Sequence, residues 1–180
     1  MKINKLLIAV LLAVYILVPV LLGGDAYVMS LVIASLVIGG IALSWALLGN
    51  LGGMVSFGHA AFFGVGAYTS AVLSMQHGLP IFLGLLMGGV GAVVSAVLML
   101  PVLRLRGPYF ALAILAYAHI FRILATEWES VTGGSAGIAS IPQLPTLFGI
   151  DFSTKIGNYL VILTIVLVFA WIYDRIRRSP

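Results

Sequence analysis

Residues 27–48 read YVMSLVIASLVIGGIALSWALL, and residues 81–103 read IFLGLLMGGVGAVVSAVLMLPVL. Each stretch has the length that an α-helix needs to cross the hydrocarbon core of a bilayer, about 20 residues. Between residues 26 and 103 there is no Asp, Glu, Lys or Arg. A soluble domain keeps charged side chains on its surface, so lipid is the solvent that this pattern indicates. The predicted fold class is an all-α, polytopic membrane bundle.

The composition extends this prediction to the whole chain. Of its 180 residues, 62% are hydrophobic and 8% are charged, against about 25% charged in ordinary soluble domains. The length suits one membrane domain, residues 1–180, with about six spans. The absence of cysteine excludes disulfides and thiolate metal sites. No group of residues has metal-ligand spacing, and the few basic residues do not form the cluster that nucleic-acid binding requires.

Six apolar stretches are predicted to cross the membrane, at residues 6–22, 27–48, 57–75, 81–103, 109–125 and 156–173. Residues 126–155 form a polar outer loop. The first stretch follows Lys2 and Lys5, as a signal peptide would. Its length and the lack of a small-x-small cleavage pattern favour a retained helix.

Basic residues predict the orientation, because cytoplasmic connections are enriched in Lys and Arg. With the N-terminus inside, the inner segments carry Lys2, Lys5, Arg104, Arg106, Arg175, Arg177 and Arg178. The outer side carries only Arg122 and Lys155, with Arg122 placed to pair with Glu127 or Glu129. Both termini are therefore predicted to be cytoplasmic.

The fourth stretch contains a ladder of small residues. Gly84, Gly88, Ala92 and Ala96 recur every four positions, so they share one helix face. Small residues let helix backbones approach closely in lipid, where hydrophobicity gives little association. The ladder predicts a tight seam with another helix.

Residues 49–58 interrupt the apolar pattern with glycine and polar groups. Irregular backbone at membrane depth is tolerated where it is buried in protein or lines a wet cavity. We therefore expect this segment beside a solute pathway. The candidate pathway residues are Ser56, His59, Phe62, Tyr68, Thr69 and Tyr109. His59 and His119 are ionisable groups within spans, which favours function, although a neutral histidine bonded to a neighbouring helix is the commoner case.

The outer loop contains a glycine-rich motif formed by Thr132, Gly133, Gly134, Ser135 and Gly137. It matches G-x-S-x-G, but the nucleophile elbow of hydrolases requires a strand before the motif and a helix after it. No catalytic residue is predicted here. Exposed backbone N–H groups in such a turn could contact a carboxylate, and a plain turn fits equally well.

Three blocks carry a family resemblance. They are GNLGGMVSFGHAAFFGVGAY at residues 49–68, RLRGPYFA at residues 104–111 and TGGSAGI at residues 132–138. In this order and spacing they resemble the permease subunits of branched-chain amino-acid ABC importers. Family members usually continue past the position of Pro180 with a helix that docks on the ATPase, so the resemblance implies a C-terminally truncated chain.

The resemblance implies a non-enzymatic transport subunit in a bacterial or archaeal plasma membrane. The implied partners are the bilayer, two cytoplasmic ATPase subunits that use ATP, a second homologous permease and a periplasmic substrate-binding protein. No cofactor is implied in this chain. Two alternatives stay open: a urea or short-amide importer permease of the same family, and a non-transporting membrane remnant or scaffold.

Overall fold

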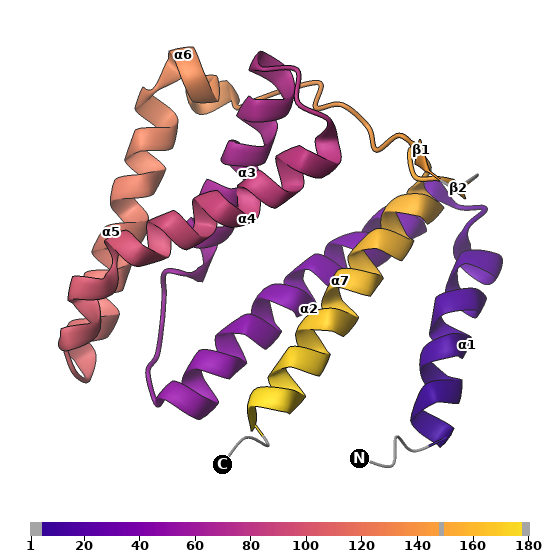
Figure 1. Ribbon diagram of the computed structural model, residues 1–180, viewed down its shortest axis with the longest axis horizontal. Coiled ribbons are helices and arrows are strands. Elements are labelled where there is room, and N and C mark those ends of the chain that lie inside the picture. Colours follow the sequence, from indigo (N-terminus) through magenta and orange to yellow (C-terminus); the bar gives the residue numbers. More distant parts are fainter. Residues whose placement is uncertain (1–4, 148–149, 178–180) are drawn as a thin grey trace. The chain divides into compact units, whose positions relative to one another are not determined.

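The computed structural model describes residues 5–147 and 150–177, and helices form most of the described chain (Figure 1). The basic residues Lys2 and Arg178, which entered the orientation prediction, lie outside the described residues. The chain divides into two compact units. The first combines the N-terminal part through Leu43 with the part from Leu144 onward, and the second is Ser44–Gln143.

The first unit contains α1 (Lys5–Leu22), the first part of α2 (Ala26–Gly52) and α7 (Lys155–Arg177). Its core is formed by Met29 of α2 and by Tyr159 and Leu163 of α7. The buried Tyr159 hydroxyl donates to the Val14 carbonyl oxygen at 2.9 Å, which connects α7 to α1. Such a bond is needed because a buried hydroxyl without a partner is costly.

A short pair of strands precedes α7. Strands β1 (Thr146–Leu147) and β2 (Ile150–Asp151) pair antiparallel, with Thr146 opposite Asp151. The Asp151 carboxylate accepts hydrogen bonds from the Ser153 hydroxyl at 2.7 Å and the Ser153 amide at 2.9 Å. These bonds stabilise the charged form and lower the pKa of Asp151. Thr154 then caps α7 by accepting from the Gly157 amide at 3.1 Å.

The second unit contains the end of α2 and the remaining helices. These are α3 (His59–Gln76), α4 (Ile81–Leu98), η1 (Leu100–Arg104), α5 (Pro108–Glu127), α6 (Glu129–Thr132) and η2 (Gly134–Ala136). Its core consists of Met99, Phe110 and Ile114, with Met54 and Phe62 packed against them. Helix α3 therefore contacts both α4 and α5.

The all-α fold class is confirmed, with local differences from the predicted boundaries. Helix α2 continues through the first glycines to Gly52, so the interruption is confined to residues 53–58. Helix α4 ends at Leu98 rather than at residue 103, and η1 follows it. Pro101 explains this end, because proline has no amide hydrogen and its ring clashes with the preceding turn.

Within the described residues, four helices are long and apolar enough to cross a membrane. They are α2, α4, α5 and α7. Helix α3 has 18 residues and carries glycine, serine, threonine and tyrosine among its apolar residues. Six crossings, the single-domain organisation and the cytoplasmic location of both ends stay predictions.

Candidate functional site

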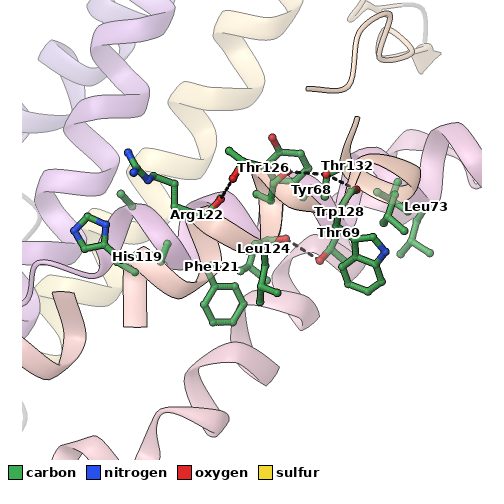
Figure 2. A pocket seen from close by; sticks show the side chains of 18 of the residues that line it. Tyr68, Thr69, Leu73, His119, Phe121, Arg122, Leu124, Thr126, Trp128 and Thr132 are labelled. Atoms are coloured by element: carbon green, nitrogen blue, oxygen red, sulfur yellow. Dashed lines mark hydrogen bonds between the residues drawn. The ribbon is translucent and has the colours of Figure 1, made fainter. Parts of the chain in front are cut away.

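A groove of about 710 Å³ lies between α3 and α5, and α6 lies at one end of it (Figure 2). Helix α3 contributes Ala60, Ala61, Gly64, Val65, Tyr68, Thr69, Val72 and Leu73. The other wall consists of Leu115, Ala118, His119, Phe121, Arg122, Leu124, Ala125, Thr126, Trp128, Val131 and Thr132. This volume and this mixture of apolar walls with a few polar groups are typical of small-molecule sites.

The seam between α3 and α4 positions the α3 wall of the groove. A Cβ atom added to Gly88 would lie 2.6 Å from the Gly66 carbonyl oxygen, so the two backbones are in direct contact. Gly84 is buried against Ser70 and Ser74, and Ala92 lies beside Gly66. The fourth member of the predicted ladder, Ala96, is exposed. The seam thus involves the first three small residues of the ladder.

Two of the predicted pathway residues line the groove. These are Tyr68, which is half-buried, and Thr69, whose hydroxyl donates to the Val65 carbonyl oxygen at 2.7 Å. Phe62 lies in the neighbouring core, with its ring centroid 5.9 Å from that of Tyr117. Tyr109 is 71% exposed at the start of α5 and is not among the groove residues.

The two remaining pathway candidates, Ser56 and His59, lie at the break between α2 and α3. Ser56 is only 2% exposed, and its hydroxyl oxygen lies 3.1 Å from His59 Nδ1. The Ser56 hydroxyl also accepts from the Gly58 amide at 3.3 Å, and the Trp45 indole donates to the Ser56 carbonyl oxygen at 2.9 Å. The polar groups of Ser56 and the Gly58 amide therefore have side-chain partners, as burial requires.

The glycine-rich motif at residues 132–137 forms a compact turn at the α6 end of the groove. Thr132 is buried, and its hydroxyl lies 2.7 Å from the carbonyl oxygens of both Ala125 and Trp128. The φ angles of Gly133, Gly134 and Gly137 are +75°, +59° and +71°, values that favour glycine. A Cβ atom at Gly133 would lie 2.3 Å from the Gly137 carbonyl oxygen. The glycines of TGGSAG are therefore explained by the positive φ angles of this turn and by the close backbone contact at Gly133.

This turn is also bound to the end of α3. The Gln76 side-chain amide donates to the Val131 carbonyl oxygen at 3.2 Å. Ser135 of the same turn is exposed. Thr132 is the member of the motif that reaches the groove, which places the motif next to the groove rather than at a separate site.

Sequence reasoning missed Arg122 as a groove residue, because it interpreted this side chain as a partner of Glu127 or Glu129. Trp128, with φ −87° and ψ 61°, ends α5, so Glu129 does not continue the helix face that carries Arg122. His119 and Arg122 are three residues apart and share a face of α5. Figure 2 shows both side chains at the end of the labelled set opposite Leu73 and Trp128. In the sequence, the spacing of His119 and Arg122 three positions apart was the signal that could have placed both on one helix face beside the groove.

Comparison with known proteins gives one family and two similar relatives. Residues 27–179 match the family described as branched-chain amino acid transport system / permease component. The chain is 36% identical to the high-affinity branched-chain amino acid transport system permease protein LivM of Salmonella typhimurium and 34% identical to LivM of Escherichia coli. Each alignment covers 73% of this chain and 36% of the relative, so the chain spans about a third of these relatives' length. No solved structure matches the chain.

Proposed function

Because the chain belongs to the family of branched-chain amino acid transport system permease components, we propose that it forms part of the inward pathway for branched-chain amino acids. Its family and its apolar helices make it a multi-pass membrane protein. The protein performs no chemical conversion and carries no cofactor. It provides a path through the bilayer that opens to one side at a time.

The observation that supports this role most directly is the groove between α3 and α5. Valine and leucine side chains form much of its surface, and the polar groups of Tyr68, Thr69 and Thr132 interrupt that surface. An aliphatic amino acid requires this combination of apolar contact and hydrogen bonding. The candidates Ser56, His59, Phe62 and Tyr109 extend the same pathway in the proposal.

The proposed assembly places this subunit in the plasma membrane of a bacterium or archaeon. Two cytoplasmic ATPase subunits hydrolyse ATP, a homologous permease completes the pore, and a periplasmic binding protein delivers the solute. This division of labour agrees with the absence from the sequence of a G-x-x-x-x-G-K-[ST] phosphate-binding loop.

Uptake by cells that express all subunits of the transporter tests the proposal. Deletion of this chain should abolish the ATP-dependent uptake of labelled leucine, isoleucine and valine, and plasmid-borne wild-type chain should restore it. Urea and acetamide serve as competing solutes. Unchanged leucine uptake after the deletion, or transport of urea without leucine, would contradict the proposed function.

A further inference from the structure

The groove is mostly apolar, and the charged side chains that line it are basic. Its basic residues, His119 and Arg122, come from one face of α5, and both are exposed. None of the described groove residues is Asp or Glu. Arg122 is exposed near the end of α5, on the side predicted to be outer, so its guanidinium is placed to meet an anionic group of a solute that enters the groove from that side.

The two ends of an amino acid would meet different surfaces in such a groove. Guanidinium presents paired N–H donors that match the two oxygens of a carboxylate, and it keeps its charge at any physiological pH. The facing α3 wall offers Val65 and Val72 as apolar surface, and Leu124 of α5 adds to it. The Tyr68 hydroxyl has no hydrogen bond to the rest of the described chain, so it is available to a solute.

We propose that Arg122 receives the carboxylate of the aliphatic amino acid during passage, while the α3 wall contacts its side chain. The assignment rests on the proposed function, because it takes the imported solute to be an amino acid. It adds that the groove selects for an anionic end. Leucinamide, in which a neutral amide replaces the carboxylate, should therefore be a poor solute for this path.

Transport by the complete transporter in proteoliposomes, with saturating binding protein, provides the first test. We expect Arg122→Gln to lower the maximal rate of leucine uptake about 10-fold or more, from the loss of a hydrogen bond to a charged group. Arg122→Lys should retain most of the rate. Arg106→Gln is the matched control, since Arg106 is exposed outside the groove, and should transport like wild type.

Cysteine labelling provides a readout that does not depend on transport. The chain has no cysteine, so the thiol of an Ala118→Cys variant is the only one in this subunit, and residue 118 lines the groove. An anionic methanethiosulfonate should react with it faster than a cationic one. Arg122→Gln in the same variant should remove that preference. Leucine should slow the labelling, and leucinamide should not.

The outcomes separate the two proposals. If the wild-type transporter does not import leucine, the proposed function fails. If the wild type imports leucine and Arg122→Gln imports it at the same rate, the carboxylate assignment is overturned and the function stands. Equal labelling by both reagents, unchanged by Arg122→Gln, also overturns the assignment. Recovery of the assembled complex in detergent shows that each variant is folded.

Discussion

The Thr132 hydroxyl joins three backbone positions where α5 meets the glycine-rich turn at residues 132–137. It lies 2.7 Å from the carbonyl oxygens of Ala125 and Trp128, and it accepts from the Gly134 amide at 3.2 Å. The side chain is buried, so water cannot easily replace these bonds. One residue thus determines how the chain turns at the end of the groove.

Replacement of Thr132 by valine keeps the shape of the side chain and removes the hydroxyl. We expect Thr132→Val to lower the free energy of unfolding by about 1–3 kcal/mol, because buried polar groups lose their partner. Thr132→Ser retains the hydroxyl and should lie much closer to wild type. Thermal unfolding of the purified complex in detergent measures both variants. A Thr132→Val midpoint equal to that of wild type would show that the bonds contribute nothing.

At the scale of elements, the seam between α3 and α4 depends on the absence of a side chain at Gly88. A Cβ atom at Gly88 would lie 2.6 Å from the Gly66 carbonyl oxygen and 3.1 Å from the Ser70 Cβ atom. The first contact is with backbone, which cannot rotate away as a side chain can. Any residue larger than glycine at position 88 must therefore move one helix relative to the other.

Gly88→Ala tests the seam, and the neighbouring Gly89→Ala is its matched control. A Cβ atom at Gly89 would meet no atom within 4 Å. We expect Gly88→Ala to cost roughly 1–3 kcal/mol of stability, the usual effect of overpacking, and to reduce leucine uptake by widening the α3–α4 distance. Gly89→Ala should be neutral or slightly stabilising, since alanine favours helix. Equal behaviour of the two variants in thermal unfolding would contradict close packing at Gly88.

At the scale of the whole molecule, the distribution of basic residues predicts which way the helices cross the membrane. The basic residues of segment 104–108 and of the end of α7 predict that both lie inside. The turn at residues 132–137 is then outside. Because α5 connects these two regions, labelling one position on each side of it determines the direction of that helix.

Single cysteines at Ser135 and Leu105 test this orientation, because both residues are exposed and the chain contains no other cysteine. A membrane-impermeant maleimide added to intact cells should label the Ser135→Cys variant. The Leu105→Cys variant should react only after the membrane is permeabilised. The reverse pattern would mean that α5 crosses in the opposite direction, and labelling of both variants in intact cells would mean that α5 does not cross.

The glycine-rich segment shows how much of a helix boundary a local sequence pattern can predict. Its composition predicted a helix interruption near residues 49–58, and residues 53–58 are indeed not helical. The pattern could not predict that α2 would continue through Gly49 and Gly52. Glycine weakens a helix without forbidding it, by about 1 kcal/mol, so its neighbours decide where the helix ends. Proline disrupts a helix more strongly than glycine does, yet the predicted span of residues 81–103 included Pro101.

The sequence alone determined that this chain is helical and embedded in lipid. A backbone in hydrocarbon must bond to itself, and long stretches without charge leave helix as the simplest solution. Only the tertiary structure decided which polar side chains meet. Tyr68 and Thr69 share a groove with Arg122 and Thr132, which lie more than fifty residues later, while Tyr109 does not. Contacts between helices depend on the packing of whole helix faces, and the periodicity of one segment of sequence does not predict which faces of two helices meet.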